Sequence, residues 1–350
     1  MITDIRLQHF RSYTDDFFDV DAGVNIIVGP NASGKTNLLE AVLVVSHGSS
    51  YKAKDQELVQ FGSDWARIDA HTASGERTVK IKAGPSINKS FVINGQAITR
   101  LHHSRTLPIV LFEPNHLLLL VGSPDLRRSF LDDLIEQTEV GFGSTRHHYR
   151  RVVSQRNALL KKNPRDLHEQ LFVWNVRLSE LGGQIAKQRQ ALVRRFNERA
   201  EELYQSLAGR DNKVTLEYAT RFNPESYESQ LLHKLESSIE QDVLRGFTAY
   251  GPHRDDLRVL IDGHEAAETA SRGETRTLVL TLKVLELKLL EELRKAKPLL
   301  LLDDVFSELD AKRRQSLTSY IADYQTFITT TDADIVAQHF EFGNVISTRL

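Results

Sequence analysis

The chain of 350 residues carries 45 Lys/Arg and 47 Asp/Glu, is 40% hydrophobic and has no cysteine. These values are ordinary for a globular protein of two or three domains, and the missing cysteine excludes disulfides and thiolate metal sites, as in a reducing compartment. No apolar run approaches the roughly 18 residues of a membrane helix, and the alternating start MITDIRLQHFRSY is no signal peptide, so we expect a cytoplasmic location and no membrane partner.

The first third of the chain is predicted to form strands around a single helix. Apolar and alternating runs indicate strands at 2–10, 24–28, 65–71, 77–83, 90–93 and 109–112. Turn pairs at Ser74-Gly75 and Asn94-Gly95 separate some of them. The apolar periodicity of 36–46 predicts the helix.

The phosphate-loop motif Gly29-x-x-x-x-Gly34-Lys35-Thr36 lies between the 24–28 strand and that helix, which is the context that supports such a motif. Backbone N–H groups of residues 29–36 and the helix N-terminus would hold nucleotide phosphates. Lys35 would reach the β- and γ-phosphates, and the Thr36 hydroxyl would be a magnesium ligand. The predicted nucleotide-binding residues of the loop are Gly29, Pro30, Asn31, Ala32, Ser33, Gly34, Lys35 and Thr36.

The middle of the chain is predicted to be helical. Leucines and other apolar residues from Leu167 to Ile185 follow a heptad pattern, and a helix unbroken from 166 to 207 would be about 60 Å long. Gly182-Gly183 is a candidate kink. We expect this segment to form a helical lobe; the alternative is a set of helices packed into one common core.

Basic residues concentrate in this segment, with 13 Lys/Arg against 4 Asp/Glu between 146 and 199. Such a surface is typical of a polyanion partner, although a solvated helix or a site for an acidic protein has the same composition. No run interleaves aromatic and basic residues to stack single-stranded bases, so we expect contacts to the backbone of duplex or junction DNA. The candidate contacts are Arg146, Arg150, Arg151, Lys161 and Lys162.

The last hundred residues return to alternating strands and helices. Strands are expected at 257–261, 299–302, 326–330 and 345–348, with helices at 274–295 and 311–323. The strand LLLL is buried on both faces by its composition and ends at Asp303 and Asp304. Two adjacent carboxylates there need a positive partner, which Mg²⁺ and Lys35 would supply.

In a phosphate-loop site, Asp303 would hold the magnesium and Asp304 would orient or deprotonate the attacking water. Some 270 residues separate Lys35 from Asp303, which an insertion between two halves of one domain explains. The sequence therefore predicts an α/β fold: a split phosphate-loop head of ABC type with an inserted helical lobe. Its expected segments are 1–130 and 247–350 for the head, and 131–246 for the lobe.

Ser271 followed by Glu274 is a capping box and starts a helix about 30 residues before the Asp303 strand. In a split phosphate-loop head this position resembles the signature loop of ABC-type ATPases, whose helix points at a nucleotide bound by a second subunit. Two heads would then form a two-fold dimer with two nucleotides between them. Ser307–Asp310 resembles the loop along such an interface.

Taken together, these motifs resemble the RecF family of bacterial DNA-repair ATPases, which are related to SMC-type heads. The resemblance covers essentially the whole chain. It rests on HFRSY (9–13), GPNASGKTNLLEA (29–41), GSPDLRRSFLD (122–132), YGPHRDDL (250–257), SRGETR (271–276), LLLDDVFSELD (300–310) and ITTTD (328–332).

The resemblance implies a slow, magnesium-dependent ATPase that dimerises on ATP and binds duplex DNA or junctions of single- and double-stranded DNA. It implies RecR as a partner, with RecO and RecA, and a role in loading RecA at gaps, in fork recovery and in SOS induction. It also implies nucleotide contacts in the partner subunit from Ser271 and Gly273.

Several positions need individual comment. Relatives have glutamines where this chain has Arg272 and Glu274, so Glu274 is expected to act as a capping partner, if not a phosphate contact. The remaining residues assigned to the nucleotide site by resemblance are Arg11, Ser307, Asp310 and Thr331, with Glu113 or Asn115 at the position of the Gln loop.

Two other functions use the same motifs. An ABC subunit that energises a membrane transporter would share the phosphate loop, but the large insertion, the GPHRDD stretch and the threonine at 331 in place of histidine weigh against it. A nucleotide-switch scaffold would bind ATP without hydrolysing it.

Overall fold

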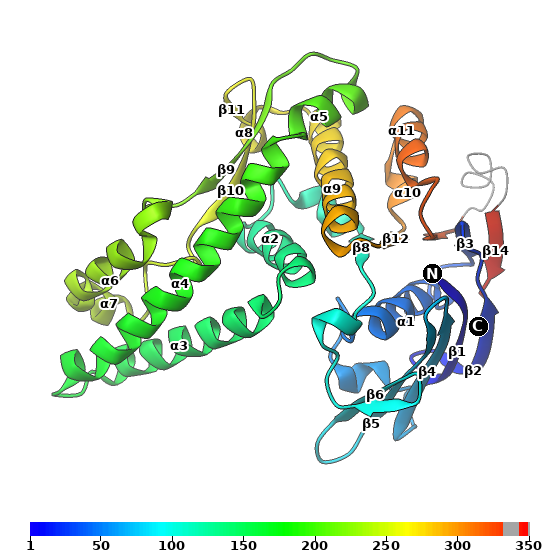
Figure 1. Ribbon diagram of the computed structural model, residues 1–350, viewed down its shortest axis with the longest axis horizontal. Helices are drawn as coiled ribbons and strands as arrows, with labels where there is room; N and C mark the ends of the chain where they lie inside the picture. The colour runs from blue at the N-terminus through cyan, green and yellow to red at the C-terminus, as the bar shows by residue number, and fades with distance from the viewer. Residues whose placement is uncertain (332–342, 349–350) are drawn as a thin grey trace. The chain divides into compact units, whose positions relative to one another are not determined.

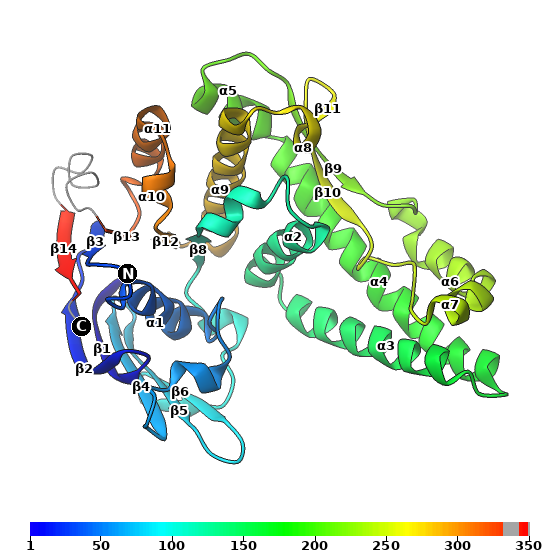
Figure 2. The same ribbon diagram turned by 180° about the vertical axis from the view of Figure 1, so that it is seen from behind.

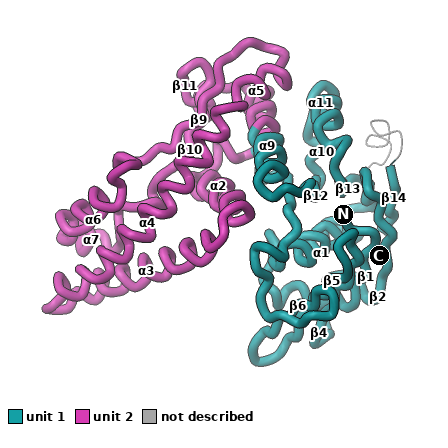
Figure 3. The backbone as a smooth tube through the Cα atoms, in the orientation of Figure 1, with its two compact units in different colours: residues 1–117, 282–350 teal, residues 118–281 magenta. Residues whose placement is uncertain are grey.

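The computed structural model describes residues 1–331 and 343–348 (Figures 1 and 2). Two compact units divide the chain: residues 1–117 with 282–350, and residues 118–281 (Figure 3). The first unit contains residues from both ends of the chain, and the second unit is the segment between them. The bounds differ from those expected, because residues 118–130 and 247–281 lie in the second unit.

Packing explains the difference in bounds. The helix α2 (Pro124–Thr138) packs on α4 (Leu167–Asn197), and β10 (Asp256–Ile261) pairs in antiparallel register with β9 (Val214–Ala219). Arg127 on α2 forms a bidentate ion pair with Asp256 at 2.7 and 2.8 Å. These flanking segments therefore share a core with the helical segment instead of with the phosphate loop.

Two sheets form the first unit. The parallel sheet has the order β14-β3-β13-β12-β8 and consists of β14 (Gly343–Ser347), β3 (Val24–Val28), β13 (Thr326–Thr330), β12 (Leu299–Asp303) and β8 (Ile109–Phe112). The antiparallel sheet has the order β2-β1-β4-β5-β6-β7 and consists of β2 (Tyr13–Asp19), β1 (Ile2–Phe10), β4 (Trp65–Thr72), β5 (Gly75–Lys82), β6 (Asn88–Ile93) and β7 (Gln96–Ile98). All four pairings in the first sheet are parallel, so its strands all end at one edge.

The helix α1 (Lys35–His47) contacts strands of both sheets and fills the core between them. Its run LLEAVLVVS is buried throughout, which is why the helix has almost no polar face. Gly34 and Gly48 flank it in left-handed conformations that favour glycine, with φ of 89° and 92°. The helix start is thereby fixed directly against the phosphate loop.

The predicted strands of this unit are confirmed, and both glycine turns connect neighbouring antiparallel strands. Two strands were missed: the short β7, and β2, the run YTDDFFD, which pairs with β1 along its length. The acidic residues of β2 are typical of a loop, but Asp15 and Asp19 share its exposed face with Phe17 at the edge of the sheet.

The second unit is mainly helical. It contains a three-stranded sheet, β11-β10-β9, with β11 at His264–Glu265. Besides α2, its helices are α3 (Phe142–Lys162), α4 (Leu167–Asn197), α5 (Ala200–Ala208), α6 (Tyr227–Ser237), α7 (Ile239–Arg245) and α8 (Ala266–Thr269). An unbroken helix from 166 to 207 does not form, because the helix is interrupted between Asn197 and Ala200.

The α4 helix continues through Gly182-Gly183 rather than ending there. A Cβ atom at Gly182 would lie 2.9 Å from Leu231 on α6, so the glycine permits close helix packing. The remaining helices are α9 (Arg272–Arg294), α10 (Val305–Glu308) and α11 (Ala311–Ile321), with 3₁₀ turns at 55–58, 103–105, 114–118 and 224–226. Within the described ranges, no helix is both long and apolar enough to cross a membrane.

Candidate nucleotide site

The edge of the parallel sheet gathers the residues that the sequence singled out. There β3 leads into the 29–36 loop, β12 ends at Asp303, β13 leads to Thr331, and β8 leads to Glu113. Ligands of open parallel sheets bind beyond the carboxyl ends of the strands. The sheet order therefore brings together residues that are almost 300 positions apart in sequence.

The phosphate loop has the backbone that its glycines require. A Cβ atom at Gly29 would lie 2.4 Å from the Ser33 hydroxyl, so no larger residue fits. Gly34 and Ala32 have positive φ, at 89° and 66°, and turn the loop toward the start of α1. The ammonium of Lys35 donates to the carbonyls of Gly29 and Pro30, at 2.7 and 2.8 Å. Lys35 is thereby held across the mouth of its own loop.

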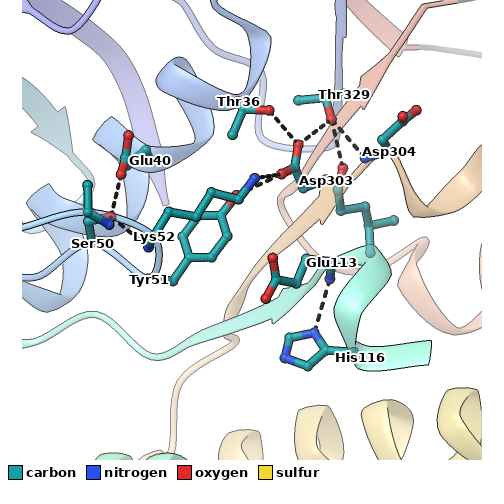
Figure 4. Close-up of polar contacts among 12 residues, drawn as sticks. Thr36, Glu40, Ser50, Tyr51, Lys52, Glu113, His116, Asp303, Asp304 and Thr329 are labelled. Atoms are coloured by element: carbon teal, nitrogen blue, oxygen red, sulfur yellow. Dashed lines mark hydrogen bonds and ion pairs between the residues drawn. The ribbon is translucent and has the colours of Figure 1, made fainter. Parts of the chain in front are cut away.

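Asp303 is the centre of a polar network (Figure 4). Its Oδ1 accepts hydrogen bonds from the hydroxyls of Thr36 (2.9 Å) and Thr329 (3.0 Å). Its Oδ2 accepts from the Tyr51 hydroxyl (2.7 Å) and from the ammonium of Lys52 (2.8 Å). The cation that contacts Asp303 here is Lys52, which the sequence did not predict. The expected partners, Mg²⁺ and Lys35, stay predictions.

The charges of the network follow from these contacts. Burial alone would raise the pKa of Asp303, but hydrogen bonds from Lys52, Tyr51 and Thr36 and the Lys52 charge bring it below its ordinary value. Burial raises the pKa of Tyr51, and the Asp303 charge adds to this effect. Asp303 is thus a carboxylate held ionised inside the protein, and Tyr51 is a neutral donor to it.

Glu113 and His116 lie beyond the end of β8. Burial raises the pKa of Glu113; Lys52 opposes that shift and Asp303 adds to it. Burial, with the charge of Lys283, lowers the pKa of His116 to about 2. The neutral His116 ring accepts a hydrogen bond at Nδ1 from the backbone N–H of Glu113, at 3.0 Å (Figure 4). His116 thereby fixes Glu113 beside the network, whereas Asn115 is exposed.

Asp304 differs from Asp303 in its exposure and in its contacts. It is exposed, whereas Asp303 is buried. It has φ of 54° as the residue that precedes α10, and its backbone N–H donates to the Thr329 hydroxyl at 2.9 Å. A non-glycine residue in this region is uncommon and typical of functional sites. The two adjacent carboxylates are thus separated into a buried acid and an exposed acid.

A second layer supports the loop that carries Tyr51 and Lys52. Arg11 forms a bidentate ion pair with buried Glu40 at 2.7 and 3.0 Å and also donates to the Glu57 carbonyl. Glu40 accepts a hydrogen bond from Ser50, whose hydroxyl accepts from the Lys52 backbone at 3.0 Å. Arg11 thereby positions the loop in this structure, and a direct phosphate contact by Arg11 stays a prediction.

The oxygens around Asp303 fit a magnesium ion. Hard oxygen ligands suit Mg²⁺, and such sites commonly use one or two protein groups together with nucleotide phosphates and water. Thr36 and Asp303 supply such oxygens 2.9 Å apart. The Lys52 ammonium contacts the Asp303 carboxylate, which shows that this carboxylate accepts a cation as a neighbour. In the described part of the chain, no cluster of three or more His, Cys, Asp or Glu residues could hold a metal by itself.

The Ser271–Glu274 segment lies in the second unit and has the predicted capping box. The Ser271 hydroxyl accepts from the Glu274 N–H at 3.3 Å, and the Glu274 carboxylate accepts from the Ser271 N–H at 2.9 Å. Glu274 also contacts Arg210 at 3.2 Å. The side chain of Glu274 therefore folds back onto its own helix, as expected of a capping partner.

The remaining nucleotide-site residues lie after β12 and β13. Ser307 is part of α10, and Asp310 caps the N-terminus of α11 by accepting from the Arg313 N–H at 3.0 Å. Thr331 is exposed immediately after β13. Their predicted contacts to a second subunit's nucleotide stay predictions.

The basic residues of α3 divide into two groups. Arg150, Arg151, Lys161 and Lys162 are exposed. Arg146 is not available as an exposed cation, because its guanidinium contacts Asp132, Asp133 and Glu136 and its side chain is 13% exposed. The pattern of residues along α3 does not reveal these contacts, because the three acids belong to a different helix, α2.

Two sets of side-chain contacts in the structure could not be predicted from the sequence. Lys52 follows a loop with no motif, and only the fold reveals its contact with Asp303. Arg156, counted among the basic surface residues, is completely buried and bonded to Asp242 at 2.7 Å and to Asn175 at 2.8 Å.

The fold and this site define a phosphate-loop ATPase head of ABC type. The model of the family described as RecF/RecN/SMC N terminal domain matches residues 1–349. A structure of an Smc head bound to the C-winged helix domain of ScpA shares the fold, with a TM-score of 0.57 at 15% identity over 100% of this chain and 94% of that one.

Closer relatives narrow the class. The DNA replication and repair protein RecF of Heliobacterium modesticaldum is 35% identical over 93% of this chain and 91% of its own length. That of Ruminiclostridium cellulolyticum is 32% identical over 99% and 95%. A solved structure of the recombination mediator protein RecF-ATPrS in the RecFOR pathway has a TM-score of 0.86 at 29% identity, over 95% and 92% of the two chains. The chain belongs to the RecF family.

Proposed function

We propose that this protein is a magnesium-dependent ATPase of recombinational DNA repair that dimerises on ATP and binds DNA. The observation that carries the proposal is the meeting of the 29–36 loop with Asp303 and Asp304 at one sheet edge. RecF relatives are named for DNA replication and repair, and one is described as a recombination mediator with bound ATP. Their agreement over nearly the whole chain supports transfer of the role.

Each residue of the site has a distinct task in this proposal. The 29–36 backbone and Lys35 bind the phosphates, and the carbonyls that now hold Lys35 release it to them. Thr36 and Asp303 would hold Mg²⁺, which neutralises charge on the β- and γ-phosphates when bound. Asp304 orients and deprotonates the attacking water, because its carboxylate is exposed at the same sheet edge as Asp303.

In the proposed dimer, residues outside the 29–36 loop contact the nucleotide of the other subunit. Ser271 and Gly273 would contact the γ-phosphate bound by the other subunit through the N-terminus of α9. Ser307, Asp310 and Thr331 would line the same interface. Hydrolysis is slow in this proposal because a complete site needs both subunits and because Glu274 is committed to its own helix.

In the cell, we propose a cytoplasmic protein that acts with RecR, and with RecO and RecA, at gaps or junctions of single- and double-stranded DNA. Fork recovery and SOS induction would follow from loading RecA there. Exposed Arg150, Arg151, Lys161 and Lys162 would contact the phosphate backbone without reading sequence.

The test of the catalytic assignment is Asp304→Asn. We expect ATP hydrolysis to fall at least ~100-fold, since a general base is lost, while ATP binding persists and light scattering shows a stable dimer with ATP. Asp323→Asn, an exposed acid after α11, is the matched control and should hydrolyse ATP normally. Normal turnover by Asp304→Asn would show that another group activates the water, and a monomer in every condition would refute the dimer.

The test of the DNA surface is the pair Arg150→Glu and Lys161→Glu. Duplex binding should weaken and the salt dependence of its affinity should lose about one unit of slope per lost phosphate contact. Lys82→Glu on β5 is the charge-matched control. Unchanged binding at moderate salt would move the duplex site to another surface.

A further inference from the structure

The GPHRDD stretch forms a turn in the second unit whose residues are mostly used for structure. Gly251 has φ of 130° and no room for a Cβ atom, which would lie 2.4 Å from the Tyr149 hydroxyl. Asp255 accepts hydrogen bonds from Tyr218 and Tyr227, both at 2.7 Å. Asp256 is paired with Arg127. Arg254, between these buried contacts, is instead exposed.

Arg254 lines a pocket that the turn shares with the end of β9, with a volume of about 490 Å³. Its other lining residues include Arg221, Phe222 and Tyr250. A volume of this size is within the range of small-molecule and cofactor sites, about 300–1,000 Å³. All of its lining residues belong to the second unit, so the pocket does not depend on the nucleotide site.

Cations lie over aromatic rings at this pocket and beside it, where Lys234 and Phe247 are neighbours of the lining residues. The Arg221 guanidinium lies 5.5 Å and the Lys234 ammonium 4.8 Å from the centre of the Tyr250 ring. Arg254 lies 4.9 Å from the centre of the Phe247 ring. No ion pair joins any of these three cations to a carboxylate within the described residues. Carboxylates are nevertheless near: the charge of Arg254 contributes to lowering the pKa of Asp125, and Glu217, Asp255 and Asp256 also line the pocket.

The aromatic residues are held in place from beneath. Phe222 contacts the Tyr227 ring edge-on, with centroids 5.1 Å apart, and Tyr250 at 6.5 Å. Tyr227 is in turn fixed by its bond to Asp255. A ligand that stacks here therefore meets rings that are already ordered, which lowers the cost of binding.

These features favour a ligand that combines a flat ring with negative charge. Cations without carboxylate partners attract phosphates, and aromatic faces stack bases. Stacking of a base on an aromatic side chain is stronger than an exposed cation–π contact. A base can therefore displace a cation from the face of Tyr250, and the displaced cation can then bind the phosphate of the same nucleotide. A base paired in a duplex keeps its faces in the stack and cannot enter.

We infer that the pocket of Arg221, Tyr250 and Arg254 binds an unpaired nucleotide of single-stranded DNA. Choosing DNA as the polyanion rests on the function proposed above; the unpaired nucleotide is a conclusion from the pocket. The site would let one subunit contact a single strand while its α3 surface contacts duplex. An acidic protein segment would satisfy the cations and leave the rings unused.

The test compares Tyr250→Leu with Tyr250→Phe in the full-length protein, using fluorescence anisotropy with a labelled oligo-dT and with a labelled duplex. Loss of the ring in Tyr250→Leu should weaken oligo-dT binding about tenfold and leave duplex affinity unchanged. Tyr250→Phe should bind as the native protein does. Arg221→Gln should weaken oligo-dT binding severalfold, and Lys187→Gln on α4, a matched charge loss, should not.

A photo-crosslink with 5-iodouracil in the oligonucleotide locates the contact, and crosslinked peptides should contain residues between 217 and 258. Native oligo-dT affinity in Tyr250→Leu, or crosslinks confined elsewhere, would overturn the inference. Equal losses in Tyr250→Leu and Tyr250→Phe would show that the hydroxyl of Tyr250, and not its ring, makes the contact, and would also overturn the inference. Absence of binding to either DNA by the native protein would instead refute the proposed function.

Discussion

The contact between Lys52 and Asp303 predicts a measurable loss of stability in Lys52→Met. Removing one partner of a buried ion pair costs about 3–5 kcal/mol when nothing replaces it. Here the Asp303 side chain is 5% exposed but that of Lys52 is 42% exposed, so solvent screens the pair. Three hydroxyl donors to Asp303 remain, from Thr36, Tyr51 and Thr329. We therefore expect a loss of about 1–2 kcal/mol.

Urea unfolding can be followed separately in the first unit. The chain has two tryptophans, and Trp174→Phe leaves Trp65 on β4 as the reporter. Native and Lys52→Met proteins would be compared in that background without nucleotide and with EDTA. Lys82→Met, an exposed lysine on β5, is the control and should change stability by less than about 0.5 kcal/mol. An unfolding curve for Lys52→Met that coincides with the native one would show that the pair does not form in solution.

Two further predictions concern the second unit, where Trp65→Phe leaves Trp174 on α4 as the reporter. Arg156→Met should destabilise this unit by about 3–5 kcal/mol, because it leaves Asp242 buried without its cation; the control Arg151→Met should have little effect, and equal stability of both would show that the buried pair does not stabilise the unit. Burial, with the charges of Arg254, Arg128 and Arg156, lowers the pKa of His253 to about 4. The unfolded state then binds the extra proton first, so about 3 kcal/mol of stability is present above pH 6.5 and is lost as the pH falls toward 4. His253→Gln should flatten the free energy of unfolding over this range and the exposed control His264→Gln should not; an unchanged slope in His253→Gln would assign it to other groups.

His253 can be neutral because both ring nitrogens are used in one tautomer. Nε2–H donates to the Thr248 carbonyl at 3.1 Å, and Nδ1 accepts from the Tyr149 hydroxyl at 2.6 Å. Protonation would place a second N–H against that hydroxyl, at a site with no carboxylate bonded to the ring. The histidine of GPHRDD is thus a structural residue, although a histidine within a motif suggests chemistry.

The sequence predicted the parts of the fold that local patterns determine. The phosphate loop carries its own glycines and is flanked by a clear strand and helix, so β3 and α1 were located within one or two residues. Strand β12 was recognised from its four leucines and the acidic pair that follows. The capping box predicted at Ser271 is confirmed by both of its hydrogen bonds with Glu274, because the two residues lie within one helical turn.

Contacts between residues that are distant in the chain could not be predicted from the sequence. Arg146 and Arg156 both count as cations in a composition argument, yet acids on α2 and α7 pair with them. Lys52 contacts Asp303 only because the loop after α1 lies beside the end of β12. The expected boundaries failed for the same reason: β9 and β10 are separated by two helices in sequence but form neighbouring strands.

The strand order of the parallel sheet also constrains how the protein is made. Strand β3 is synthesised about 300 residues before its neighbours β13 and β14, and Val28 pairs with Thr330. At about 5–20 residues per second, the ~300 intervening residues take roughly 15–60 s to translate. Throughout that time the apolar faces of β3 and α1 have no completed sheet to cover them. The insertion that divides the head therefore also creates a period in which the nascent chain exposes apolar surface, and a product truncated before β13 lacks strands that its first unit needs.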